Sequence, residues 1–407
     1  MLFALEKIAL RLYMAGFKLA TALLPFRWPQ VFHGANSSHD LLAHIAAQQH
    51  SGLLLVSDAA LSKLGVLAPI QAELERLYIP YQLFDQITPD PTNAQIEAGY
   101  QALLAANASA LLAVGGGSVM DAAKLIGARA KNNRPVLNMS GLLRVWRGML
   151  PVYAIPTTAG TGSEVTIAAV VSDPANKRKL PLIDVRLLPK AAALDASLMA
   201  GLPPAITAST GMDALTHAIE AFLSKNATRA TDQQALAAAK AIFQYLPRAY
   251  QNGADLEARQ QMAEAAHLAG KAFTVAGVGY VHAIAHQLGA YYHLPHGLAN
   301  AIVMPTVLQF SEPKARRKMA LLAKHCQLAG AEATEQEAAQ ALIIAIRTLN
   351  QDFCIASTIA ELKPGDIQAI AKAALKEARF TYAVPRYLNQ QSAVQLIRQL
   401  LPAATTV

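Results

Sequence analysis

Four histidines and one aspartate in the second half of the chain have the types and the spacing of metal ligands. Asp213 and His217 lie four residues apart in a segment of helical period, which places them on one face of a helix. His282 and His286 repeat this spacing, and His296 follows in a Pro-His-Gly segment. One carboxylate and three imidazoles would form a closed site for iron, zinc or a similar divalent ion, leaving one histidine near the chemistry. An isolated pair of this kind is more often a surface pair or a core histidine, so the metal interpretation depends on the whole set.

The first half of the chain carries polar segments directly after predicted strands. Residues 115–118 read Gly-Gly-Gly-Ser before a helical segment, where glycines let the backbone approach a pyrophosphate and free N–H groups favour its charge. Asp58 follows another strand, where a carboxylate accepts hydrogen bonds from the adenosine ribose and repels a 2′-phosphate, selecting NAD over NADP. A third segment, residues 156–164, is rich in hydroxyls and glycine. A tight turn, a helix N-cap and a polar loop are the respective alternatives.

The elements that would position these residues follow from apolar periodicity. Short apolar strands alternate with helical segments in the first half, which predicts a parallel sheet with crossover helices. From about Pro203 onward the pattern is helical only. We therefore expect an amphipathic helical extension over 1–28, an α/β NAD-binding domain over 29–202 and an all-helical metal-binding and catalytic domain over 203–407. The expected strands are residues 53–56, 79–84, 110–114 and 152–155.

The composition excludes several classes of protein. The 407 residues are 53% hydrophobic and 15% charged, which excludes a disordered chain and suits two domains. The formal charge of +8 comes from dispersed basic residues, so we expect no nucleic-acid partner. The two cysteines, Cys326 and Cys354, argue against a disulfide scaffold and thiolate zinc, and favour a reducing cytoplasm. Because no run of about 20 apolar residues occurs, we expect no conventional membrane span.

The first 28 residues predict an amphipathic helix. At about 100° per residue, Lys7, Arg11 and Lys18 form a narrow basic stripe, and apolar side chains cover most of the remaining circumference. Such a helix packs on the enzyme or its subunit partner, or it lies in a membrane interface. We favour peripheral membrane contact at the inner face of a membrane, with packing as the alternative. The segment lacks the clean apolar region of a signal peptide, so we expect it to be retained.

Four longer motifs give the sequence a specific resemblance. It resembles the iron-containing (group III) alcohol dehydrogenase family over roughly residues 30–400. The motifs are GGGSVMDAAK at residues 115–124, PTTAGTGSEVT at 156–166, GMDALTHAIEAF at 211–222, and residues 279–305, which contain HAIAHQLGA and PHGLANAIVMP.

The resemblance implies a role for individual residues. The metal would be Fe²⁺, with Zn²⁺ as the alternative, and the catalytic residue beside nicotinamide and substrate would be His286. The implied metal ligands are Asp213, His217, His282 and His296. The implied NAD contacts are Asp58 at the ribose, Gly116, Gly117, Ser118 and Asp121 on the pyrophosphate and nicotinamide side, Thr157, Thr158 and Thr161 along the rest of the cofactor, and Lys179.

The hypothesis for the reaction is hydride transfer from an alcohol to NAD. The metal would lower the pKa of the alcohol oxygen so that an alkoxide forms near neutral pH, and an aldehyde would be reduced in the reverse direction. His286 would relay the proton outward or only shape the pocket. The small or apolar residues 167–169 favour small or aliphatic primary alcohols. We expect a homodimer or a higher homo-oligomer.

Two other functions remain as alternatives. One is a hydroxyacid-oxoacid transhydrogenase that keeps its nicotinamide bound, and the other is a non-catalytic membrane-associated scaffold built on a dehydrogenase fold. The sequence also departs from the family at two places. Asp90 stands where many members have asparagine before Pro-Thr, and Val275 stands where many have asparagine ahead of the histidine pair. The first departure is expected to alter the adenine pocket, and the second the polarity on the substrate side.

Overall fold

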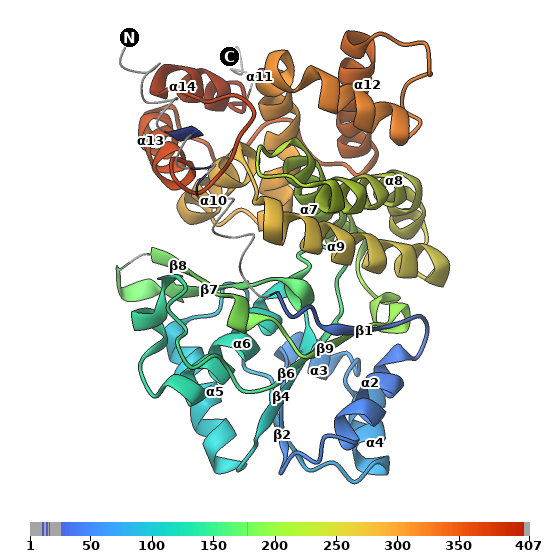
Figure 1. Cartoon of the computed structure of the whole chain (residues 1–407), viewed down its shortest axis with the longest axis vertical. Coiled ribbons are helices and arrows are strands. Elements are labelled where there is room, and N and C mark those ends of the chain that lie inside the picture. The colour runs from blue at the N-terminus through green and yellow to red at the C-terminus, as the bar shows by residue number, and fades with distance from the viewer. Residues whose placement is uncertain (1–9, 12–13, 15, 17–25, 177, 403–407) are drawn as a thin grey trace. The chain divides into compact units, whose positions relative to one another are not determined.

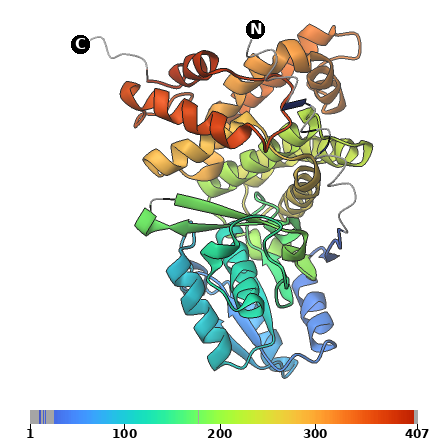
Figure 2. The same ribbon diagram turned by 60° about the vertical axis from the view of Figure 1, so that its left-hand side comes forward.

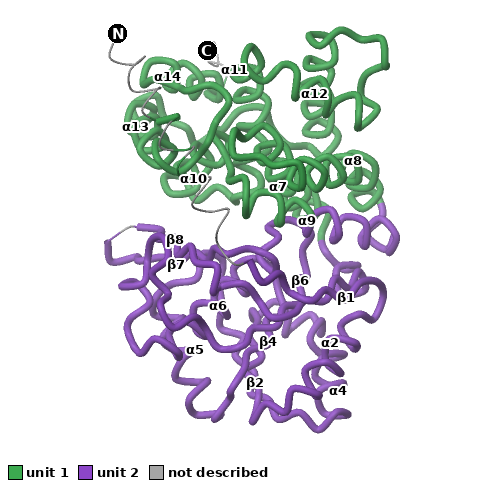
Figure 3. The backbone as a smooth tube through the Cα atoms, viewed as in Figure 1, with its two compact units in different colours: residues 1–24, 203–251, 268–407 green, residues 25–202, 252–267 purple. Residues whose placement is uncertain are grey.

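The computed structural model describes residues 10–11, 14, 16, 26–176 and 178–402. The chain divides into two compact units, shown in Figure 3. The sheet unit is residues 25–202 and 252–267, and the helical unit is mainly residues 203–251 and 268–407. The predicted boundary near Leu202 lies where the chain passes from the sheet unit to the helical unit, and residues 252–267 return to the sheet unit.

The sheet unit is built around six parallel strands in the order β1-β9-β6-β4-β2-β3 (Figure 1). The predicted parallel α/β fold is therefore confirmed. The four strands expected from the sequence are β2, β3, β4 and β6, whereas β1 and β9 were not expected. The strands are β1 (Gln30–His33), β2 (Leu53–Val56), β3 (Tyr81–Phe84), β4 (Ala110–Gly115), β6 (Val152–Pro156) and β9 (Ala191–Leu194).

Helices cover both faces of this sheet, as Figure 2 shows from a second direction. On β2, Leu53 and Leu55 face the layer of α2 and α4, while Leu54 and Val56 face the layer of α5 and α6. A strand buried on both faces needs apolar side chains at every position, which is why β2 reads as a continuous apolar run. The helices of this unit's two layers and edges are α2 (Ser37–Ala46), α3 (Ala59–Lys63), α4 (Ala68–Arg76), α5 (Asn93–Ala105) and α6 (Gly117–Asn132).

A small second sheet in the same unit was not expected from the sequence. Its strands are β5 (Gly141–Leu142), β7 (Ala168–Asp173) and β8 (Arg178–Ile183), in the order β5-β8-β7. Strands β7 and β8 pair antiparallel, and β7 alternates between buried and half-buried residues. Pro181 lies within β8, and a proline argues against strand in a sequence-based prediction.

The helical unit contains long helices, as predicted. The capping box of Thr334 and Glu337 starts α12 at the position that the sequence indicates. No described helix is by itself long and apolar enough to span a membrane, although α9 and α10 pass such a test together, bent by 102°. The helices are α7 (Pro204–Leu223), α8 (Arg229–Gln251), α9 (Leu256–Ala276, whose first twelve residues belong to the sheet unit), α10 (Tyr280–Tyr292), α11 (His296–His325), α12 (Glu335–Asp352), α13 (Ile367–Ala378) and α14 (Gln390–Arg398).

The predicted N-terminal helix lies largely outside the described residues. Of residues 1–28, the structure describes Leu10, Arg11, Met14, Gly16 and residues 26–28. Leu10 and Met14 are helical and buried. Their burial agrees with the alternative in which this segment packs on the protein.

Candidate functional site

Helix α7 presents Asp213 and His217 on one buried face. The helix begins with Pro204 in the first turn, where proline costs no hydrogen bond, and residues 211–223 are buried all round, as in a core helix. His217 Nδ1 lies 4.0 Å from Asp213 Oδ2, and both side chains are almost inaccessible to solvent. The four-residue spacing thus brings the two side chains together as the sequence predicts.

Helices α10 and α11 bring two further histidines to the same carboxylate. His282 Nε2 lies 3.9 Å from Asp213 Oδ1, and His296 Nε2 lies 3.4 Å from the same oxygen. The atoms that Asp213, His217, His282 and His296 offer as ligands all lie within 4.8 Å of one another. Gly297 allows this approach, because a Cβ atom there would overlap the backbone oxygen of Ser209 on α7.

The chemistry of these four side chains fits a divalent cation. Burial and the neighbouring imidazoles lower the pKa of His282 well below its usual value, so its ring is neutral and can act as a ligand. Asn300 Nδ2 donates to Asp213 Oδ1 at 2.7 Å and lies 3.3 Å from His282 Nε2 and 3.2 Å from His296 Nε2. An oxygen of Asp213 and the Nε2 atoms of two histidines thus lie around one donor, the amide NH₂ group of Asn300. One carboxylate and three imidazoles suit iron, zinc or a related ion.

Glu220 contacts His282 from the side opposite its Nε2 atom. Its Oε2 accepts hydrogen bonds from His282 Nδ1 at 2.6 Å and from the Gly279 backbone at 2.7 Å, and its Oε1 accepts from Val281 N at 2.7 Å. Burial raises the pKa of Glu220 to about 7, while these hydrogen bonds act in the opposite direction. The site therefore contains a buried carboxyl group that the sequence-based interpretation did not include.

His286 lies beside the four clustered residues but is not one of them. Its ring stacks on His296 with centroids 5.2 Å apart, and its side chain is 41% exposed. His286 Nδ1 lies 2.7 Å from Glu377 Oε1, which also accepts a hydrogen bond from the Tyr382 hydroxyl at 2.6 Å. The hydrogen bond to Glu377 places the ring hydrogen on Nδ1, so Nε2 of His286 is the basic nitrogen.

In the sheet unit, the predicted cofactor residues follow the carboxyl ends of three neighbouring strands. Asp58 comes after β2, the glycine loop (residues 115–118) comes at the end of β4, and Thr157 comes after β6. Strand β4 pairs with both β2 and β6. The chain order changes direction between β2 and β4, because β3 lies outside β2 and β4 lies on its other side. In open parallel sheets, such a switch point is where nucleotides bind.

Asp58 is the N-cap of α3. Its Oδ1 accepts hydrogen bonds at 2.9 Å from the backbone N–H groups of Ala60 and Leu61. The helix-cap alternative is thus realised. It occupies one carboxylate oxygen and leaves Oδ2 outside the cap, so the cap does not exclude the ribose role.

The glycine loop and the segment after β6 approach each other closely. Gly116 is the N-cap of α6, and a Cβ atom on Gly117 would lie 2.7 Å from the Thr161 methyl carbon. Thr157 N donates to Gly115 O at 3.1 Å, and Thr158 flanks Gly116. Glycine is needed at 117 because there is no room for a side chain, and the start of a 16-residue helix offers N–H groups to an anion.

Asp121 and Lys124 on α6 form hydrogen bonds with the segment that follows β6 and with the start of β7. Asp121 accepts from Ser163 Oγ at 2.7 Å and from Val170 N at 2.9 Å, so both of its oxygens are bonded within the protein. Lys124 is fully buried, and its Nζ lies 3.0 to 3.1 Å from Ser163 Oγ, Thr166 O and Oγ1, and Ala168 O. Burial lowers the pKa of Lys124 to about 8.

Ser118 and Lys179 meet at Asp90, the residue that departs from the family pattern. Lys179 Nζ pairs with Asp90 Oδ2 at 2.7 Å, and the Asp90 backbone donates to Ser118 Oγ at 3.3 Å. Asp90 adopts a left-handed backbone conformation with φ of 59°, which aspartate and asparagine tolerate better than most residues. The departure therefore supplies a carboxylate partner for the lysine that was predicted to contact the cofactor.

Sequence reasoning missed Glu220, Asn300 and Glu377. Two of them carried a signal, because Glu220 lies three residues after His217 and Asn300 lies four after His296, hence on the same helix faces. Glu377 lies 91 residues from His286, and no spacing connects them.

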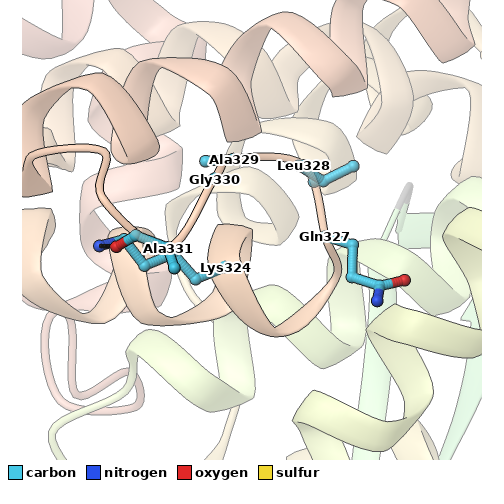
Figure 4. Close-up of a pocket in the computed structure, with 6 residues that line it drawn as sticks. All are labelled: Lys324, Gln327, Leu328, Ala329, Gly330 and Ala331. Atoms are coloured by element: carbon cyan, nitrogen blue, oxygen red, sulfur yellow. Dashed lines mark hydrogen bonds between the residues drawn. The ribbon is translucent and has the colours of Figure 1, made fainter.

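A separate hollow of about 580 Å³ lies in the helical unit, at the end of α11 (Figure 4). It contains none of the predicted site residues. Its lining residues are Lys324, Gln327, Leu328, Ala329, Gly330 and Ala331.

One unit has a parallel sheet of the nucleotide-binding type, and the other has a cluster of one aspartate and three histidines that could hold a metal ion. The family description "Iron-containing alcohol dehydrogenase" matches residues 29–196, and "Fe-containing alcohol dehydrogenase family, C-terminal" matches residues 207–401. The chain belongs to the iron-containing alcohol dehydrogenase family.

Individual relatives cover most of the chain. It is 39% identical over 350 residues to the NAD-dependent methanol dehydrogenase of Bacillus methanolicus, covering 86% of this chain and 92% of that protein. It is 43% identical over 327 residues to 1-propanol dehydrogenase PduQ of Salmonella typhimurium, covering 78% and 85%. A crystal structure of 1,3-propanediol oxidoreductase superposes with a TM-score of 0.89 at 34% identity, covering 93% of this chain and 100% of that one.

Proposed function

We propose that this protein is an NAD-linked alcohol dehydrogenase and aldehyde reductase that uses one Fe²⁺ ion, with Zn²⁺ as the alternative metal. The observation that carries the proposal is the convergence of Asp213, His217, His282 and His296 within the helical unit. These residues would hold the ion. When bound, a divalent ion would act as a Lewis acid on an alcohol oxygen, and NAD would be the hydride acceptor.

The sheet unit would bind NAD through its strand ends. Backbone N–H groups at the start of α6 would bind the pyrophosphate, and Asp58 would accept hydrogen bonds from the adenosine ribose. Support comes from the start of α6 at Gly117, where the backbone offers N–H groups next to two glycines, and from the position of Asp58 at the switch point. The same carboxylate would disfavour the 2′-phosphate of NADP.

Oxidation of an alcohol releases a proton, and we propose that His286 carries it. Its Nε2 atom would accept the proton, while Nδ1–H remains bonded to Glu377. The carboxylate stabilises the imidazolium that forms, and Tyr382 and Gln287 hold the carboxylate in place through hydrogen bonds of 2.6 and 2.8 Å. The exposure of the His286 side chain supports exchange of the proton with solvent.

We propose small or aliphatic primary alcohols and their aldehydes as substrates, and the cytoplasm as the location. The residues after the Ser163 motif are Ile167, Ala168 and Ala169, which bring no charge, and relatives are named for methanol, 1-propanol and 1,3-propanediol.

The test is metal analysis of protein purified without air, followed by turnover assays with a panel of alcohols and aldehydes and with NAD and NADP. His217→Ala and His282→Ala are expected to lose both the metal and the activity while keeping the fold, because three ligands hold an ion much less tightly than four. His325→Ala, which removes an exposed histidine at the end of α11, is the control and should keep both. Full activity in either site variant would refute the proposed metal centre.

A further inference from the structure

We propose that Glu220 is a positioning residue of the metal centre, which fixes the tautomer and the ring orientation of His282 so that Nε2 faces the metal. The inference rests on the proposed function, because it assigns a role relative to the proposed metal.

The carboxylate of Glu220 accepts three hydrogen bonds, two at Oε2 and one at Oε1. Oε2 accepts from His282 Nδ1 and from Gly279 N, and Oε1 accepts from Val281 N, all between 2.6 and 2.7 Å. A carboxylate that accepts from Nδ1 requires the hydrogen to be on that nitrogen. The lone pair is then on Nε2, the atom that lies 3.9 Å from Asp213 Oδ1. Histidine ligands generally have such a partner on their second nitrogen.

The backbone is shaped to admit this carboxylate. A Cβ atom on Gly279 would lie 2.6 Å from Glu220 Oε1. The φ of Gly279 is −142°, which other residues also adopt, so the glycine is explained by space and not by conformation. The carboxylate therefore reaches the first turn of α10 only because position 279 has no side chain.

One helix face supplies both ligands and their support. Glu220 lies three residues after His217 and seven after Asp213 on α7, so all three side chains project toward α10. A carboxylate at the start of α10 also stabilises that helix through its dipole. A helix cap alone needs only the two backbone hydrogen bonds, whereas the bond to His282 is the one that a positioning role requires.

The experiment measures binding of Co²⁺ alone to apo protein, by titration and by its visible spectrum, which reports the coordination geometry. Glu220→Ala should weaken Co²⁺ binding by about 10- to 100-fold and alter the spectrum, as loss of a histidine's supporting partner does. Glu220→Gln keeps an oxygen that can accept from His282 Nδ1, so it should bind Co²⁺ more tightly than Glu220→Ala. Glu312→Gln is the matched control, because Glu312 is also buried in this unit but pairs with Arg316 instead of a histidine. It should bind Co²⁺ as the wild type does.

Gly279→Ala provides a second route if a Glu220 variant fails to fold. The added methyl group displaces the end of a flexible side chain and leaves the carboxylate in the protein, so weaker Co²⁺ binding and an altered spectrum are again expected.

The outcomes separate this inference from the proposed function. Wild-type Co²⁺ affinity and spectrum in Glu220→Ala, with only a lower melting temperature of the apo protein, would make Glu220 a helix cap and overturn the inference alone. If the wild type binds no Co²⁺, or His282→Ala binds it equally well, the proposed metal centre fails, and the role of Glu220 with it.

Discussion

Replacing Asp58 with asparagine would separate the two roles of this residue. Asparagine is as good an N-cap as aspartate, so Asp58→Asn keeps the hydrogen bonds to Ala60 and Leu61 that hold α3. It removes only the negative charge. Asp58→Ala removes both the charge and the cap.

The size of the effect follows from the position of Asp58. Two unit charges 4 Å apart repel by about 1 kcal/mol in water and about 4 kcal/mol at an effective dielectric constant of 20. A 2′-phosphate carries roughly 1.5 to 2 negative charges at pH 7. Because Asp58 is only half-buried, the repulsion lies toward the lower limit, at about 2 kcal/mol. This corresponds to roughly 30-fold in kcat/KM for NADP relative to NAD.

The assay is steady-state kinetics with both cofactors, combined with thermal unfolding. Asp58→Asn is expected to raise the NADP to NAD ratio of kcat/KM by roughly 30-fold with an unchanged melting temperature. Asp58→Ala should raise the ratio similarly and lose about 1 kcal/mol of stability. An unchanged ratio in Asp58→Asn, with destabilisation in Asp58→Ala, would show that Asp58 is a helix cap and nothing more.

Three further predictions concern other parts of the chain. The folded pKa of Lys124, about 8, lies below its unfolded value of about 10.5, so the cost of burying its charge is relieved as pH rises from 8 to 10.5. The free energy of unfolding of the wild type should therefore gain about 3 kcal/mol relative to Lys124→Met across this window, and parallel pH profiles would contradict this. Maleimide should label Cys354 alone in the native protein and Cys326 only after unfolding, since burial raises the pKa of Cys326 to about 12; two labels in the native protein would contradict this. Deleting residues 1–28 should leave turnover of short alcohols intact. Peripheral membrane contact, unlike packing on the protein, predicts that the full-length protein sediments with anionic liposomes at low salt and that the deletion variant does not.

Much of the fold could be predicted, because strands that are buried on both faces of a sheet appear in the sequence as continuous apolar runs. Strands β2, β4 and β6 are fully buried apolar runs, and the capping box of α12 marks its start. Strand β1 is largely exposed and short, and β9 is mostly alanine, a residue more typical of helices. Those two strands form only where their neighbours provide pairing partners, which the local sequence does not reveal.

The parts of the candidate site that lie on a single helix could be predicted from helical spacing. The pair Asp213 and His217 follows from one turn of α7. Residue type and spacing also indicated His282, His286 and His296, and the motif resemblance selected His282 and His296 as the ligands. The bond between His286 and Glu377 depends on how α10 and α13 pack, which is a tertiary property. Likewise, the pairing of Lys179 with Asp90 spans 89 residues, and no pattern within either segment indicates it.

The buried cation of Lys124 also constrains how the segment after β6, which contains Ser163 and Thr166, can change over generations. Its ammonium group donates to Ser163 and Thr166 at a fully buried position, so replacing either residue removes one of the hydrogen bonds that compensate the buried charge. Each single step is therefore costly, and apolar replacement of the side chains together would still leave the backbone oxygens of Thr166 and Ala168 without this donor. Substitutions here are expected to be strongly non-additive in a double-mutant cycle. Homologues that keep the lysine at position 124 are therefore expected to keep the serine at 163 and the threonine at 166. Substitutions in this segment should occur at positions that do not form hydrogen bonds with the lysine.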